Sequence, residues 1–301
     1  MKRLRRPLSL STTLLALLVL GGTLLAGSTA VRADAGSRVA LAGTVSFESD
    51  TGLYSTDLTS GQVRRIPGTG AGYGDPVWSP DGTRLLFDRQ QDLARGLDWN
   101  EPRDVYVMNA DGSGLRQLTF NPGDDGWAKW SPDGRSIVFS SERYHRSGIY
   151  AMNVRTGAAR YVVDGEYPSW RIDGRILFTS AGQILTVRPY GAQRRPLRTR
   201  TYDVIGAVPS PDGTKIAYIT DDFELYSARA DGSDARALAG ELTGDANDPA
   251  WSPDGEWVVY DYPNALERAS DIYLIHPDGT SNQRVTRTGN ASCPDWRTEP
   301  V

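Results

Sequence analysis

The residues of this sequence that most often carry catalysis are few and far apart. There are two histidines, His145 and His276, and one cysteine, Cys293. His276 lies in a predicted tight turn and His145 in a predicted loop, while no basic side chain stands next to Cys293 to activate it. The sequence also has no Gly-x-Ser-x-Gly, His-Glu-x-x-His or Ser-x-x-Lys motif and no phosphate-binding loop. It therefore favours a protein without catalytic function.

Acidic and aromatic side chains gather in and beside the segments that separate the predicted strands. Such carboxylates could bind Ca²⁺ through oxygen ligands or dock a basic peptide, and neighbouring aromatic rings would add contact area. An ordinary solvated loop face is the alternative. The candidate binding residues are Asp75, Trp99, Asp124, Asp125, Trp127, Tyr167, Asp221, Asp222, Asp245 and Asp248. Beyond Ca²⁺, no cofactor is expected.

A five-residue motif accounts for another set of aspartates. Trp-Ser-Pro-Asp-Gly begins at Trp78, Trp130 and Trp251, and altered copies begin at Trp170 and Pro209. Proline presets φ, the aspartate can cap its own backbone and glycine tolerates φ > 0, so the motif predicts a tight turn. We therefore expect structural roles for Trp78, Trp130, Trp170, Trp251, Trp296, Asp81, Asp133, Asp173, Asp212 and Asp254.

The spacing of this motif predicts the architecture. The tryptophan positions 78, 130, 170, 209, 251 and 296 are separated by 52, 40, 39, 42 and 45 residues, close to the roughly 40–45 residues of a propeller blade. Short runs such as Ser136–Ser140 and Gly148–Asn153 predict strands, and no helical period of useful length follows residue 36. One blade cannot bury both of its faces, whereas a ring of blades can. The sequence therefore predicts an all-β, six-bladed β-propeller.

These motifs resemble those of the TolB-like β-propeller family, over nearly all of residues 37–301. In that family the strand with Trp-Ser-Pro-Asp-Gly is innermost in its blade and the strand ending in Leu-Thr is outermost. The resemblance implies that the chain begins with the second to fourth strands of a blade and ends with that blade's innermost strand, Cys293–Trp296. The ring would then close by pairing of the C-terminal strand with the N-terminal blade.

One departure from the family limits what the resemblance implies about partners. TolB itself has an α/β domain before its propeller, whereas here only a few residues separate the predicted leader from the first predicted strand. The partnership of TolB with a peptidoglycan-associated lipoprotein is therefore not assumed.

The first 35 residues have the composition of a secretory signal peptide. Basic residues between Lys2 and Arg6 precede an apolar run, Leu14–Leu25, and a small-residue cleavage pattern at Ala33-Asp34-Ala35. The apolar run is shorter than the ~20 residues of a spanning helix, so no membrane span is expected after cleavage. We predict a signal peptide at residues 1–35 and the propeller at 36–301. The protein would be exported by the Sec or twin-arginine route and be secreted, periplasmic or bound in the cell envelope.

The charge balance narrows the choice of partner. The chain has 33 Lys and Arg against 37 Asp and Glu, and loss of residues 1–35 would raise the acidic excess from four to eight. This disfavours nucleic acid and anionic lipid as partners. We expect a monomer that docks a protein or peptide at the acidic mouth, the loop-rich end of the channel opposite the motif turns. Two alternatives stay open: a carbohydrate-active or metal-dependent enzyme on a propeller scaffold, and a purely structural scaffold.

Overall fold

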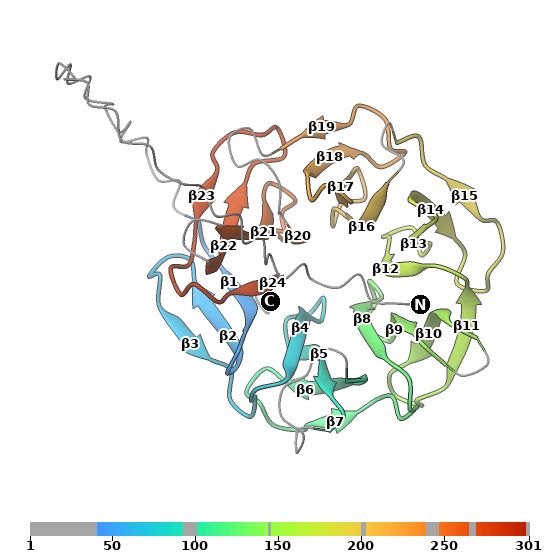
Figure 1. Ribbon diagram of the computed structural model, residues 1–301, viewed down its shortest axis with the longest axis horizontal. Coiled ribbons are helices and arrows are strands. Elements are labelled where there is room, and N and C mark those ends of the chain that lie inside the picture. The colour runs from blue at the N-terminus through green and yellow to red at the C-terminus, as the bar shows by residue number, and fades with distance from the viewer. Residues whose placement is uncertain are drawn as a thin grey trace, which may run out of the picture. The chain divides into compact units, whose positions relative to one another are not determined.

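The computed structural model describes residues 41–92, 101–143, 146–199, 203–238, 247–264 and 269–298. The predicted signal peptide and the candidate residues Trp99 and Asp245 lie outside these ranges. Residues Leu41–Val301 form one compact unit, whose described strands make six four-stranded sheets around a central axis (Figure 1). No helix in the described ranges has the length and apolar character of a membrane span. The prediction of an all-β, six-bladed propeller is confirmed.

Each sheet is an antiparallel blade whose strands follow one another from the channel to the rim. The innermost strands are β4 (Tyr73–Trp78), β8 (Asp125–Trp130), β12 (Glu166–Trp170), β16 (Val204–Pro209), β20 (Asn247–Trp251) and β24 (Ser292–Arg297). The second strands are β5 (Arg84–Gln90), β9 (Ser136–Ser141), β13 (Ile176–Ser180), β17 (Lys215–Thr220), β21 (Val258–Asn264) and β1 (Thr44–Ser49). The third strands are β6 (Arg103–Asn109), β10 (Gly148–Asn153), β14 (Gln183–Val187), β18 (Leu225–Arg229), β22 (Ala269–Ile275) and β2 (Gly52–Asp57). The outermost strands are β7 (Arg116–Gln117), β11 (Ala159–Val163), β15 (Arg195–Pro196), β19 (Arg236–Ala237), β23 (Gln283–Arg284) and β3 (Val63–Arg65).

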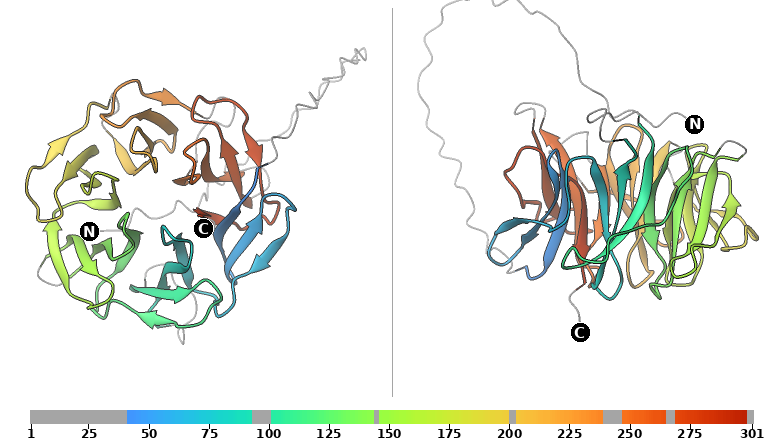
Figure 2. Two further views of the ribbon diagram at one scale, coloured as in Figure 1. Left: turned by 180° about the vertical axis from the view of Figure 1, so that it is seen from behind. Right: turned by 90° about the horizontal axis from the view of Figure 1, so that it is seen from below.

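The two ends of the propeller share one sheet. β24 pairs antiparallel with β1, with Trp296 opposite Val45, so red and blue strands lie side by side (Figure 2). Arg297 then contacts the next blade: its Nε donates to the carbonyl oxygen of Gly82 at 3.0 Å, and its guanidinium lies 4.6 Å from the centre of the Trp78 ring. The predicted closure of the ring by the C-terminal strand is confirmed.

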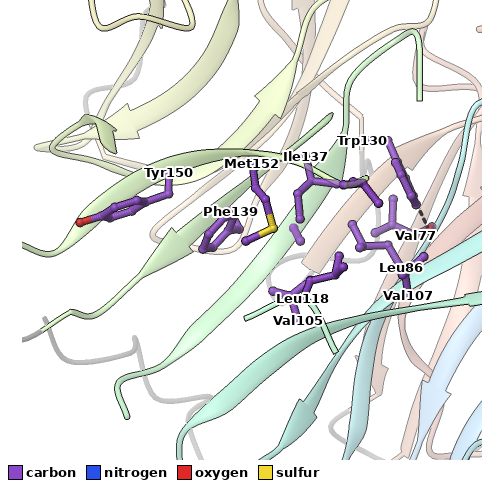
Figure 3. Close-up of a cluster of buried hydrophobic side chains, with 12 residues drawn as sticks. Val77, Leu86, Val105, Val107, Leu118, Trp130, Ile137, Phe139, Tyr150 and Met152 are labelled. Atoms are coloured by element: carbon purple, nitrogen blue, oxygen red, sulfur yellow. Dashed lines mark hydrogen bonds between the residues drawn. The ribbon is translucent and has the colours of Figure 1, made fainter. Parts of the chain in front are cut away.

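The motif tryptophans fill the space between adjoining blades. Trp130 packs in one cluster with Val77 and Leu86 of the preceding blade, and its Nε1 donates to the carbonyl oxygen of Val77 at 3.2 Å (Figure 3). Trp251 makes the same bond to Val208, also at 3.2 Å. Both indoles are buried, and truncating such a side chain to alanine typically costs about 3–5 kcal/mol. These contacts hold neighbouring blades at a fixed distance from the axis.

The motif aspartates bond within their own turns. Oδ1 of Asp133 accepts a hydrogen bond from Oγ of Ser131 at 2.6 Å, and Gly134 follows with a φ of 64°. Equivalent bonds from the serine two residues earlier lower the pKa of Asp81 and of Asp212 to about 2. These turns join the innermost strand of a blade to its second strand, so they lie at the end of the channel opposite the start of the innermost strands.

Candidate functional site

A repeated irregularity in the innermost strands builds the candidate site. Each innermost strand contains a β-bulge, where its register with the second strand of the blade shifts. The bulge lies at or beside the residue three positions before the motif tryptophan, or before Pro209 in β16. In five blades the residue at this position has a left-handed φ between 45° and 51°. These residues are Asp75, Trp127, Tyr167, Asp248 and Cys293. We call them, together with Gly206 at the same position of the sixth blade, the channel ring.

The channel ring surrounds a small cavity on the propeller axis. The cavity encloses ≈ 70 Å³ and is lined by the innermost strands of all six blades. Lys129, Ala207, Val208 and four prolines complete the lining around the ring. Because these strands converge at the axis (Figure 1), residues from both ends of the chain face one another here.

One side of the cavity carries carboxylates and the thiol. Sγ of Cys293 donates to Oδ2 of Asp248 at 3.2 Å, and the backbone N–H of Cys293 donates to Oδ1 of Asp261 at 3.3 Å. Asp75 follows Cys293 around the ring, and its N–H donates to Oε2 of Glu48 at 3.3 Å. We call Glu48, Asp75, Asp248 and Asp261 the acidic arc. Carboxylates held this close together attract a cation.

A buried arginine supports the acidic arc. Nη1 of Arg103 lies 2.5 Å from Oδ1 of Asp88, and the two side chains are 4% and 2% exposed. Burial alone would lower the pKa of Arg103, but the carboxylates of Asp88, Glu48 and Asp75 outweigh it and raise that pKa. Gly74 permits this arrangement because a β-carbon there would overlap the guanidinium. Arg103 therefore holds part of the arc in place and offsets part of its charge.

The opposite side of the cavity is aromatic. The rings of Trp127 and Tyr167 meet edge to face, with centroids 5.0 Å apart and planes at 62°; we call this pair the aromatic corner. Gly206 comes next around the ring and leaves a gap between Tyr167 and Asp248. A β-carbon at residue 206 would lie 3.9 Å from Cβ of Tyr167, an ordinary contact distance. The cavity thus combines carboxylates, the faces of two aromatic rings and the space left by the missing side chain at Gly206.

Two further ionisable side chains lie on the same strands. Lys129 lines the cavity from β8. Oδ2 of Asp295, on β24, accepts a hydrogen bond from the backbone N–H of Trp78 at 2.7 Å. Burial raises the pKa of Asp295 to about 6, although the charge of Lys129 and the bond from Trp78 act in the opposite direction. Asp295 therefore takes up a proton in mildly acidic solution.

The structure brings part of the candidate set together. Asp75, Trp127, Tyr167 and Asp248 all line the cavity. Asp124 is not part of the lining; its Oδ1 accepts a hydrogen bond from the backbone N–H of Arg103, at the start of β6, at 2.8 Å.

Other candidates lie elsewhere. Asp125 is fully buried at the start of β8, where Asn121 donates to it and burial raises its pKa to about 6, so it belongs to the interior of its blade and not to a solvated mouth. Asp221 and Asp222 lie on the exposed turn between β17 and β18. Trp99 and Asp245 lie outside the described residues.

Sequence reasoning did not single out several residues of the site. The candidate binding residues do not include Glu48, Lys129, Cys293 or Asp295. The available signal was the recurring pattern X-Pro-x-Trp, which begins at residues 75, 167, 248 and 293. Its first residue is the channel-ring position in each of these four blades.

The acidic arc also offers metal ligands. One ligand atom each from Glu48, Asp75 and Cys293 lie within 4.8 Å of one another. The two carboxylates suit Ca²⁺, but Ca²⁺ takes six to eight oxygen ligands, and the sulfur of Cys293 is a soft donor. The guanidinium of Arg103 beside these carboxylates also repels a divalent cation. The donor set therefore fits Ca²⁺ only in part.

Comparison with known proteins finds similarity in part of the sequence and in the fold. The profile of the TolB beta propeller domain matches residues 89–188. The structure of TolB from Acinetobacter baumannii has a TM-score of 0.71 to this chain at 19% identity, covering 85% of this chain and 66% of that one. The chain is similar to the TolB-like β-propellers. At that identity, the structural likeness shows the fold alone.

Relatives found by sequence show how much of this chain and of each relative the similarity covers. The propeller is 26% identical over 204 residues to an uncharacterized protein of Agrobacterium fabrum, covering 60% of this chain and 67% of that protein. It is 28% identical over 224 residues to an uncharacterized peptidase of Bacillus subtilis (67% and 32%). It is 25% identical over 256 residues to the Tol-Pal system protein TolB of Francisella tularensis (81% and 48%). The chain thus spans about a third of that peptidase and about half of that TolB.

Proposed function

We propose that this propeller is a non-catalytic binding protein that docks an extended segment of a partner protein at the channel ring. The ring lies near the start of the innermost strands, at the end of the channel away from the motif turns. It offers a cavity with polar, charged and aromatic walls on a rigid scaffold, which is the usual form of a binding site.

The observation that carries this proposal is the choice of residues on the bulges. A non-glycine residue held at a φ near +50° costs about 1–2 kcal/mol relative to the right-handed region, and large side chains are rare there. Glycine would remove that cost if the bulges served only the backbone. Trp127, Tyr167 and Cys293 occupy them instead, and their side chains line the cavity. Backbone strain that persists for the sake of particular side chains is typical of functional sites.

The relatives support a role in protein interaction. Those called Tol-Pal system protein TolB are parts of a named protein system, and the propeller covers about half of their length. We therefore propose protein binding in general for this chain. The partners of those TolB proteins and the activity of the peptidase relative are not proposed for it. The basic and apolar leader of residues 1–35 supports export, so we place the binding event outside the cytoplasm, in the envelope or the surrounding fluid. We propose that the protein acts there as a monomer.

A pull-down with three forms of the full chain tests the proposal. The forms are the wild type, the double variant Trp127→Ala/Tyr167→Ala and the control Ile172→Ser. Ile172 is 60% exposed in the motif turn after Trp170, so its replacement leaves the channel ring intact. All three should first show the same cooperative melting. From envelope extract and culture fluid of the producing organism, wild type and control should capture the same protein, and the double variant should lose most of it.

Two results would count against the proposal. Retention of the same partner by the double variant would place docking elsewhere on the molecule. A wild-type chain that captures nothing from either source would favour the purely structural scaffold.

A further inference from the structure

The walls of the cavity indicate which part of a partner enters it. We propose that the channel ring binds the cationic side chain of an arginine or lysine, presented by an extended segment of the partner protein. This inference rests on the proposed docking function and specifies the chemistry of the residue that occupies the cavity.

The charges around the cavity favour a cationic occupant. Asp75 and Asp248 line the cavity. Glu48 accepts a hydrogen bond from the backbone N–H of Asp75, and Asp261 accepts one from the backbone N–H of Cys293. The described cations of this region have acidic neighbours already, because Arg103 is ion-paired with Asp88 and Lys129 is attracted to Asp295. An incoming carboxylate would meet like charge on the acidic arc, whereas an incoming cation of single charge would be attracted by its members, most of all by Asp248 and Asp261, because Arg103 offsets part of the charge of Glu48 and Asp75.

The aromatic corner also favours a cationic occupant. The faces of Trp and Tyr rings attract cations through their quadrupole, and a desolvated site strengthens this attraction. Trp127 and Tyr167 present such faces across the cavity from the acidic arc. An arginine can stack its planar guanidinium on an aromatic ring while its N–H groups donate to a carboxylate such as Asp248. A simple metal ion would use the carboxylates but would gain little from the indole and the phenol.

The size of the cavity limits what can enter it. A cavity of ≈ 70 Å³ accommodates the end of a side chain and not a folded segment. The missing side chain at Gly206, between Tyr167 and Asp248, leaves space beside the wall for the aliphatic stem of that side chain. Four lining prolines keep the walls stiff, so little conformational freedom is lost on binding.

Short peptides test the charge requirement directly. Four end-blocked pentapeptides, Gly-Ser-X-Ser-Gly, would carry arginine, lysine, citrulline or glutamate at X; citrulline has the shape of arginine without its charge. Titrated into the full chain at low salt and followed by calorimetry, the arginine and lysine peptides should bind at least tenfold more tightly than the other two. Their affinity should fall as salt is raised to about 0.5 M, because added ions screen the acidic arc.

Gly206 supplies a matched pair of variants. Its φ is not in the left-handed region and a β-carbon fits there, so both Gly206→Ala and Gly206→Leu should fold. The leucine side chain would fill the gap and lower the affinity for the arginine peptide at least tenfold. The alanine variant should stay within about twofold of wild type. Asp248→Asn should weaken the arginine peptide and leave the citrulline peptide unchanged.

Three outcomes would overturn the inference. They are equal binding of the citrulline and arginine peptides, no binding of the arginine peptide up to about 10 mM, and a melting temperature raised by millimolar Ca²⁺ in a chain that ignores the arginine peptide. The last result would assign the cavity to a metal. The proposed function has a separate readout: if the double variant loses its partner in the pull-down while no peptide binds, docking stands and only the arginine or lysine assignment fails.

Discussion

Replacing Asp295 by asparagine should stabilise the propeller near neutral pH. Asp295 lies on the closing strand β24, where Oδ2 accepts the N–H of Trp78 at 2.7 Å and burial raises the pKa to about 6. An asparagine offers the same oxygen acceptor without a negative charge. The bond to Trp78 therefore survives the change, and the cost of keeping a charge in the channel is removed.

The sign and size follow from the raised pKa. Asp295 titrates near 3.8 in the unfolded chain and at about 6 in the folded one. Above pH 6 both states are ionised and the folded state bears the full cost of the charge; as the pH falls towards 4, the folded state binds a proton first and stability rises. The shift corresponds to about 3 kcal/mol at neutral pH. Because the Asp295 side chain is only partly buried, solvent screening reduces this figure, and we expect the variant to gain about 1–2 kcal/mol.

Urea unfolding of both proteins near pH 7.5 and near pH 5 measures the effect. The wild type should gain about 1 kcal/mol on acidification that Asp295→Asn does not gain. Asp104 and Asp125, whose pKa is also raised to about 6, are present in both proteins and cancel in the difference. Asp212→Asn is the control, because the pKa of Asp212 is lowered to about 2 and its contribution is lost only in stronger acid. The reasoning is refuted if Asp295→Asn keeps the wild-type pH dependence or is less stable than wild type near pH 7.5.

Two further predictions concern the scaffold. Deleting residues 292–301 removes β24, leaves the edge of β1 unpaired and should give aggregated protein, as judged by size-exclusion chromatography; a soluble truncation with cooperative melting would contradict the closure. Gly134→Val should lower the free energy of unfolding by about 1 kcal/mol or more, because φ is 64° there and a β-branched residue resists it. Asp133→Asn should cost less in the same urea titration, since asparagine also caps such a turn, and equal losses from the two changes would disprove this account of the turn.

The blade architecture could be predicted because its signals are local. The tight turn of Pro132-Asp133-Gly134 depends on a preset φ, a short capping side chain and a residue that tolerates φ > 0, all within a few residues. Strand alternation in a run such as Gly148–Asn153 is equally local. Repetition of these signals at 39–52-residue intervals, together with a final strand lacking partners of its own, was enough to predict six blades and the pairing of β24 with β1.

The burial of individual candidate residues depended on where each strand begins. Asp124 and Asp125 are neighbours in the sequence and both were assigned to the mouth. β8 begins at Asp125, and successive side chains of a strand point to opposite sides, so Asp125 is buried in its blade while Asp124 bonds to the backbone of Arg103. A shift of one residue in the start of β8 would have exchanged the two environments, and composition alone does not determine that start.

The sequence by itself determined the repeat, the turns, the strand order and the acidic balance of the chain. Only the tertiary structure decided that Asp75, Trp127, Tyr167, Asp248 and Cys293 face a common cavity with Gly206 as its gap. The physical reason is that the cavity exists only when six innermost strands meet at one axis, and that a β-bulge in each strand turns the ring residue towards it at a φ that few side chains adopt. The pattern X-Pro-x-Trp marks the bulge in four of the blades, but the meeting of six strands at one axis is not a property of any short segment, because it arises from the closure of the ring and the packing of one blade against the next.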